Sequence, residues 1–109
     1  NVQISINLIK DKNLPENKII TDLLDGGSQD IALNMLKDAT LQNYEDRNTL
    51  ANAYHNYGVV LVILGKFDEG IDYIKKALYI NPSEKKYKDA LLFANKEKAF
   101  NQKYLEQRQ

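Results

Sequence analysis

The chain has 109 residues, of which 43% are hydrophobic and 28% are charged. These values are typical of one small globular domain and not of a disordered or fibrous protein. The 15 basic and 15 acidic side chains give a formal net charge of zero. No overall positive field therefore gathers nucleic acid or an anionic membrane, and we expect no nucleic-acid partner.

The sequence contains no cysteine, which excludes a disulfide framework, a thiolate nucleophile and a Cys-ligated zinc site. The longest apolar run, residues 59–64, is far shorter than the roughly 20 residues that span a bilayer, so we expect no membrane insertion. The chain opens with Asn1 and without a basic-then-apolar signal segment. We therefore expect a processed product or a piece of a longer protein.

Residues 1–12 carry two periodicities at once. Val2, Ile4, Ile6 and Leu8 alternate with polar residues, as in a strand, whereas Val2, Ile6 and Ile9 also fit one helical stripe. A lone strand has nothing to pair with in a chain that otherwise has helical patterns. We favour a helix docked on the helices that follow. The alternatives are an extended arm and an edge strand torn from a neighbouring domain.

Residues 13–25 are predicted to form a short helix. Asn13 and Glu16 have the spacing of a capping box, and Pro15 is tolerated in a first turn. The apolar face consists of Ile19, Ile20, Leu23 and Leu24. Gly26 and Gly27 are expected to end this helix.

A second helix of about three turns is predicted after Ser28, which can cap it. Its apolar residues recur at three- and four-residue steps: Ile31, Ala32, Met35, Leu36 and Ala39.

Residues 51–84 hold small, aromatic and proline residues at the spacing of a helix-turn-helix unit. Gly58 allows two helices to approach closely, Gly65 ends the first helix in a left-handed conformation, and Phe67 buries its ring beneath the turn. Pro82 closes the unit, after which Ser83 can cap the next helix. The other anchor positions are Tyr54, Tyr57, Leu61, Gly70 and Ala77, with Ile71, Ile74 and Leu78 on the inner face of the second helix.

This segment resembles a tetratricopeptide repeat, because its anchor residues agree in register across 34 residues without a gap. The β-branched run at residues 59–63 would also fit a buried strand, but the registered positions favour a helix. The resemblance implies an all-α fold, an α-α superhelix of helical hairpins. Residues 13–50 would be a degenerate hairpin of the same kind, since Gly27 and Gly65 are 38 residues apart instead of 34.

Residues 85–109 are predicted to be a C-terminal capping segment. We expect one long helix from Glu84 to about Gln107, because this stretch lacks Gly and Pro and is rich in helix formers. Its core-facing stripe, Tyr87, Ala90, Leu91 and Ala94, would cover the open end of the preceding unit. A neighbouring stripe consists of Phe93, Phe100 and Tyr104. It is either part of a wide core-facing band or a contact for a homodimer or a partner helix.

The resemblance also implies a concave groove lined by the first helix of each unit. Transferred to this chain, the partner-binding residues are Asn52, His55, Asn56, Val59, Val62 and Ile63. Repeats that clamp the carboxylate of a chaperone tail place Lys and Arg at such positions, and none is present here, which argues against a carboxylate clamp. A rival interpretation is that the N-terminal helix buries Val62 and Ile63.

The sequence gives little support for catalysis, and we expect no enzyme, no cofactor and no metal. His55 is the only histidine, and Gly26 and Gly27 lack the spacing and the Lys of a phosphate-binding loop. Lys85, Lys86 and Lys88 flank Tyr87, but Glu84 and Asp89 dilute this basic patch, which favours a solvated helix face over a nucleic-acid site.

The predicted function is therefore a protein–protein interaction module that binds a peptide or helix of a partner protein in the groove of a short tetratricopeptide-like array. The alternative is a structural spacer or homo-oligomerisation segment whose groove is filled by its own N-terminal arm.

Overall fold

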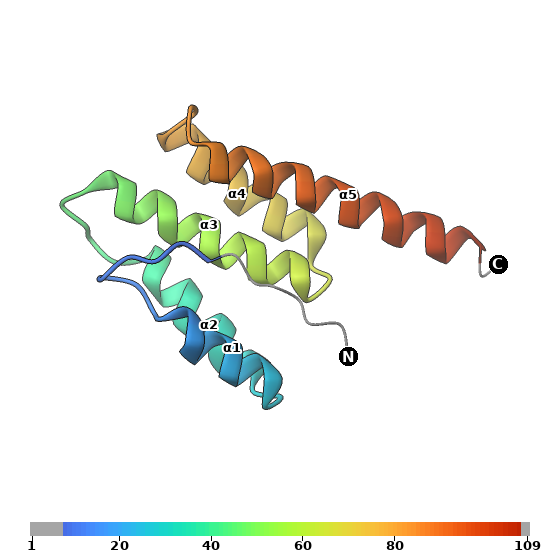
Figure 1. Ribbon diagram of the computed structural model, residues 1–109, viewed down its shortest axis with the longest axis horizontal. Coiled ribbons are helices and arrows are strands. Elements are labelled where there is room, and N and C mark those ends of the chain that lie inside the picture. Colours follow the sequence, from blue (N-terminus) through green and yellow to red (C-terminus); the bar gives the residue numbers. More distant parts are fainter. Residues whose placement is uncertain (1–7, 108–109) are drawn as a thin grey trace.

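Five helices make up the computed structural model, which describes residues 8–107 (Figure 1). Their bounds are α1 (Asn17–Asp25), α2 (Gln29–Thr40), α3 (Arg47–Ile63), α4 (Phe67–Ile80) and α5 (Lys85–Gln107). The predicted all-α fold is confirmed, and residues 59–63 are helical, so the strand interpretation of that run is wrong. None of these helices is long and apolar enough to cross a membrane.

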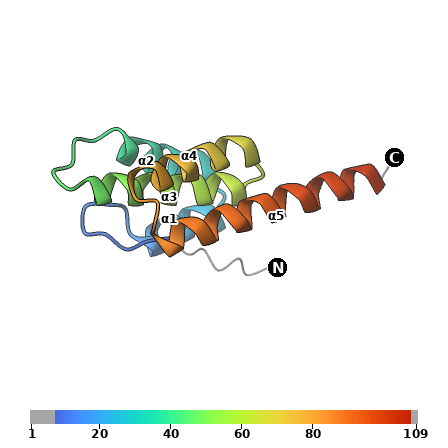
Figure 2. The same ribbon diagram turned by 90° about the horizontal axis from the view of Figure 1, so that it is seen from above.

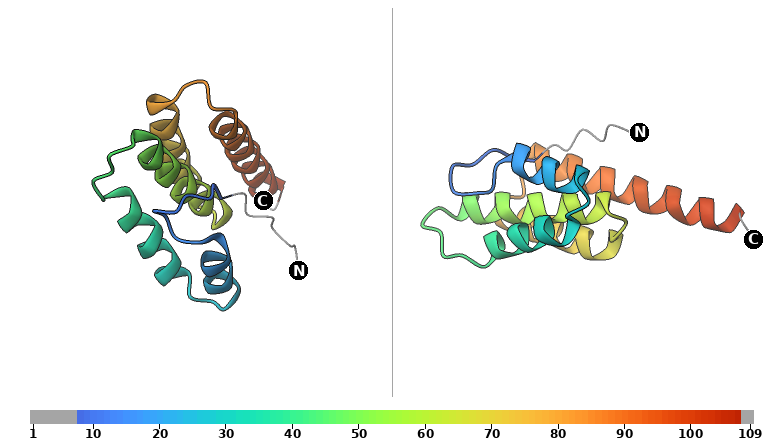
Figure 3. Two further views of the ribbon diagram at one scale, coloured as in Figure 1. Left: turned by 60° about the vertical axis from the view of Figure 1, so that its left-hand side comes forward. Right: turned by 90° about the horizontal axis from the view of Figure 1, so that it is seen from below.

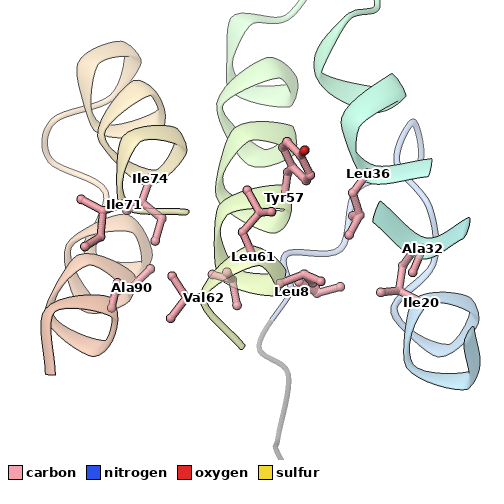
Figure 4. Close-up of a cluster of buried hydrophobic side chains, with 13 residues drawn as sticks. Leu8, Ile20, Ala32, Leu36, Tyr57, Leu61, Val62, Ile71, Ile74 and Ala90 are labelled. Carbon is pink, nitrogen blue, oxygen red and sulfur yellow. The ribbon is translucent and has the colours of Figure 1, made fainter. Parts of the chain in front are cut away.

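Successive helices pack in antiparallel pairs around α3, which lies in the middle of the molecule (Figure 3). The α1–α2 hairpin lies on one side of α3, and α4 with the first half of α5 lies on the other side. Figure 4 shows the buried side chains that join these layers: Ile20 from α1, Ala32 and Leu36 from α2, Tyr57, Leu61 and Val62 from α3, Ile71 and Ile74 from α4, and Ala90 from α5. The core is therefore continuous from the first hairpin to the last helix.

Both hairpins turn in the same way. Gly27 and Gly65 have positive φ angles of 82° and 86°, as predicted for residues that end a helix. The following amides reach back five residues, from Ser28 to the Leu23 carbonyl and from Lys66 to the Leu61 carbonyl, at 2.8 Å in each case. This is the Schellman arrangement, which satisfies the last carbonyls of a helix and requires a residue without a Cβ clash.

The α3–α4 hairpin closes on a glycine contact. A Cβ atom on Gly58 would lie 2.8 Å from the Gly70 carbonyl oxygen, and one on Gly70 would lie 2.6 Å from the Gly58 carbonyl oxygen. The two helix backbones touch at this crossing, and the close approach predicted for Gly58 is confirmed.

The start of α1 differs from the prediction. Asn13 does not cap a helix; its amide donates to the Asp11 carboxylate at 3.0 Å, and Leu14 donates to the Asp11 carbonyl in a tight turn. The helix begins four residues later, with Glu16 at the N-cap position. Two effects explain this difference. Pro15 disfavours the helical conformation for the residue before it, and Leu14 is buried against α2 and α3.

The helix favoured for residues 1–12 is wrong where the structure describes this segment. Residues 8–10 have no regular secondary structure, and residues 11–14 form the turn described above. The extended-arm alternative agrees with this path, and the Leu8 side chain is buried in the main core. The periodicity at Val2, Ile4 and Ile6 lies outside the described residues.

Helix α5 has the predicted extent and runs past the rest of the molecule (Figure 2). Its first half packs through the predicted stripe, in which Tyr87, Ala90 and Ala94 are buried and Leu91 is partly buried. Beyond the ion pair between Lys98 and Asp68, its side chains are mostly exposed.

Candidate partner-binding groove

The predicted groove residues on α3 are mostly covered. His55, Asn56, Val59 and Val62 are buried, whereas Asn52 and Ile63 are half-buried. Val62 faces the crossing with α4, because a Cβ atom on Gly70 would meet its Cγ2 at 2.6 Å. The N-terminal segment that covers part of α3 is residues 8–11, which lie between α1 and α5 (Figure 3).

Asn56 holds the main chain of Ile9 with both ends of its carboxamide. The Ile9 amide donates to Asn56 Oδ1 at 2.8 Å, and Asn56 Nδ2 donates to the Ile9 carbonyl at 3.0 Å. These two bonds determine which end of the carboxamide is oxygen. The contact joins residues 47 positions apart in the chain, and its hydrogen bonds involve the backbone of Ile9 and not its side chain.

His55 is placed by the same carboxamide. Its Nδ1 lies 3.0 Å from Asn56 Oδ1, and since that oxygen can only accept, Nδ1 carries the proton of the neutral ring. The ring also lies against Tyr87, with centroids 5.5 Å apart. Burial lowers the pKa of His55 below its ordinary 6.5, and the hydrogen bond with Asn56 partly opposes this shift. His55 is therefore a neutral, packed histidine at neutral pH.

The Asp11 carboxylate contacts α3 at Thr49 and Asn52, which precede Asn56 along the helix. Its Oδ2 accepts from Thr49 Oγ1 at 3.0 Å and from Asn52 Nδ2 at 3.5 Å. The Asn13 amide is the main cause that lowers the pKa of Asp11; burial opposes it, and the bonds from Thr49 and Asn52 add to the lowering. The carboxylate is thus held by neutral donors.

Tyr87 connects this cluster to α5. Its hydroxyl donates to Asn52 Oδ1 at 2.5 Å, which turns Asn52 Nδ2 toward Asp11. Burial raises the pKa of Tyr87 to about 12, with smaller contributions from Glu84 and Asp11. Three separate parts of the chain, residues 8–11, α3 and α5, therefore meet in one polar network.

A pocket of about 480 Å³ remains open beside this network. It lies between α3, α5 and the start of the described chain, and its lining residues are Leu8, Ile9, His55, Val59, Ile63, Lys86, Asp89, Ala90 and Phe93. Three of the six predicted groove residues thus line a pocket, while Asn52 and Asn56 contact residues 8–11 instead. That any of the six contacts a partner stays a prediction.

Phe93, Phe100 and Tyr104 do not form a core-facing band, because they are 37%, 69% and 51% exposed. Phe93 forms part of the pocket wall, and the other two lie farther along α5. Sequence reasoning missed Asp11 and Thr49, and it predicted burial of Tyr87 but not its hydrogen bond to Asn52. These contacts join distant parts of the chain. Within residues 8–107, no three His, Asp or Glu side chains are grouped as a metal site would require.

Comparison with known families finds a match to the tetratricopeptide repeat at residues 51–84, the unit indicated by the glycine, aromatic and proline positions. The match begins inside α3 and ends just before α5. Neither the curated proteins nor the solved structures gave a significant match to the chain.

Proposed function

Because residues 51–84 are a tetratricopeptide repeat, a unit that implies a protein-interaction module, we propose that the partner of this chain binds at the pocket between α3 and α5. The observation that supports this proposal is the pocket itself, which stays open although residues 8–11 cover the neighbouring part of α3. Its volume suits one or two side chains of a partner protein.

The chemistry of the pocket wall favours an amphipathic segment. Val59, Ile63 and Phe93 offer apolar contact, and Lys86 and Asp89 place one charge of each sign at the α5 side. Phe100, seven residues after Phe93 on α5, is also exposed. A partner peptide or helix could thus place an apolar side chain in the pocket and follow α5 beyond it.

Affinity capture from an extract of the source cells tests this assignment. We expect Ile63→Asp and Phe93→Ser to release a partner that the wild-type chain retains. Tyr79→Ser is the matched control, since Tyr79 is an aromatic residue on α4 that is 85% exposed. Retention of the partner by both pocket variants would place the interface elsewhere, whatever the fold.

The second candidate function is a structural spacer or homo-oligomerisation segment. It is favoured by the contact of residues 8–11 with α3, because a face that its own chain covers needs no partner. Light scattering over a range of concentrations distinguishes the two. A tight dimer that Phe100→Ser dissociates would support oligomerisation through α5, and a monomer at all concentrations would support partner binding.

A further inference from the structure

We propose that copies of this chain associate head to tail, with one exposed face of α5 on one molecule seated against the α1–α2 end of the next. Neither surface includes a residue of the pocket wall. The contact joins two different surfaces, so it is also distinct from the tight dimer considered above.

The charges of the chain are sorted along its length. Residues 17–46, which comprise α1, α2 and the connection to α3, hold six acidic and two basic side chains, a net charge of −4. Residues 47–84 hold four of each sign, whereas α5 holds six basic and three acidic side chains, a net charge of +3. The zero net charge of the whole chain therefore conceals two oppositely charged parts.

These two parts lie at opposite ends of the molecule. The helices are layered in the order α1–α2, α3–α4 and α5 (Figure 3), and of the described helices neither α1 nor α2 contacts α5. The neutral α3–α4 hairpin thus separates the acidic end, residues 17–46, from the basic helix.

One face of α5 carries most of the positive charge of that helix. We call this face the basic stripe; its residues recur at steps of three and four and all of them are exposed: Lys85, Lys88, Leu92, Lys96, Ala99 and Lys103. At about 100° per residue, the basic stripe lies on the side of α5 opposite to the buried Ala90 and Ala94. It therefore faces away from the rest of its own chain.

Little within the chain neutralises the basic stripe. Asp89 pairs with Lys85 at 3.0 Å, but no salt bridge among the described residues includes Lys88, Lys96 or Lys103. Three ammonium groups along one helix face are thus available to an acidic surface.

The acidic end matches the basic stripe in charge and in length. Its six carboxylates are all exposed: Asp22, Asp25, Asp30, Asp38, Glu45 and Asp46. The basic stripe extends for about 27 Å and α2 for about 18 Å, at 1.5 Å per residue, so α2 fits along the stripe. Each surface also has an exposed aliphatic side chain for the contact to bury, Ile31 on α2 and Leu92 on the stripe.

A second copy is the occupant that these surfaces favour, because every molecule carries both of them. A net charge of zero means that no overall repulsion opposes the approach of two copies. Each contact leaves one acidic end and one basic stripe free, so the assembly grows with concentration instead of closing at a dimer. Salt should weaken the contact, since exposed charges interact over about 8 Å at physiological ionic strength but over about 30 Å at 0.01 M salt.

Sedimentation velocity over a range of protein concentrations at about 0.01 M salt tests the proposal. We expect the wild-type chain to form dimers and then larger species as the concentration rises, with an affinity at least about tenfold lower at about 0.3 M salt.

Two variants each remove one of the surfaces. Lys88→Gln/Lys96→Gln/Lys103→Gln removes three charges from the basic stripe, and Asp25→Lys/Asp30→Lys brings the acidic end to zero net charge. Each variant alone should be monomeric. Their equimolar mixture should form a complex of one chain of each kind and nothing larger, because each supplies the surface that the other lacks.

The matched control is Lys66→Gln/Lys75→Gln/Lys76→Gln, which removes three exposed lysines outside both surfaces and should associate like the wild-type chain. A wild-type chain that stays monomeric at low salt, or that stops at a dimer, would overturn the proposal. An equal loss of association in the control would do the same, since net charge and not the basic stripe would then be responsible.

Circular dichroism checks that each variant keeps its helices. If the triple stripe variant does not, Lys96→Gln/Lys103→Gln replaces it with a smaller loss of association expected, and unchanged association overturns the proposal. Failure here leaves the pocket assignment unaffected, because Ile63 and Phe93 belong to neither surface.

Discussion

Gly58 and Gly70 face each other at the crossing of α3 and α4, each occupying the space that a Cβ atom on the other helix would need. Gly58→Ala would place a methyl group 2.8 Å from the Gly70 carbonyl oxygen and 2.9 Å from Ile74 Cγ1. We expect the steric cost, about 1–3 kcal/mol, to exceed the gain of about 1 kcal/mol in helix propensity. Urea denaturation should therefore show a lower free energy of unfolding.

Gly70→Ala should also lower the free energy of unfolding. The double variant should lower it by less than the sum of the two single effects, because one separation of the helices relieves both clashes. Gly27→Ala is an informative comparison, since no atom lies within 4 Å of its Cβ position and only the positive φ opposes the change. A Gly58→Ala chain as stable as the wild type would mean that the helices are not in contact there.

Asn56→Ala should destabilise the chain although Ala has a higher helix propensity than Asn. The substitution leaves the amide and carbonyl of Ile9 without partners in a partly buried site, which costs about 1–3 kcal/mol. Chemical denaturation of Asn56→Ala and of the matched control Asn95→Ala, an exposed position on α5, measures the difference. Equal midpoints for the two variants would contradict the described contact.

The stability of the chain should fall as the pH drops below about 6.5, in part because of His55. Its pKa is lowered in the folded chain, so the unfolded chain takes up the proton first. The contribution of His55 is fully present above 6.5, its unfolded value, and is lost as the pH falls toward the folded value.

A His55→Gln variant keeps a polar side chain and cannot titrate in this range. The difference in free energy of unfolding between the wild-type chain and this variant should shrink between pH 7 and pH 5, since the carboxylates common to both cancel. A difference that stays constant over this interval would show that His55 is not buried as a neutral ring.

Tyr87→Phe should lower stability by about 0.5–1.5 kcal/mol, the usual net value of one hydrogen bond, because Asn52 loses the hydroxyl that orients it. Tyr79→Phe removes a hydroxyl from an exposed ring and should have no measurable effect. Alkaline absorbance titration gives an independent check: Tyr87 should ionise at about pH 12, and its signal should be missing from the Tyr87→Phe variant.

The repeat and its turns could be predicted from sequence because local residues determine them. Gly65 ends α3 where a left-handed residue is needed, and Gly58 stands where two helices meet, so both positions are visible in a single pattern. The long α5 also follows from local helix propensity.

The path of residues 8–14 could not be predicted in the same way. Burial of Leu14 outweighs the capping box at Asn13, and the pairing of Ile9 with Asn56 joins positions far apart in sequence. The pocket was predicted only in part for the same reason. His55 and Ile63 follow from the repeat register, whereas Lys86 and Phe93 reach the pocket through the packing of α5.

The network of Asp11, Asn52 and Tyr87 also bears on how the chain loses its structure. In stacked helical repeats each unit contacts only its neighbours, so the ends can fray while the middle persists. Here a hydrogen-bonded bridge spans positions 11, 52 and 87. Amide protons in α3 and in the first half of α5 should consequently exchange with deuterium at similar rates, as parts of one cooperative unit.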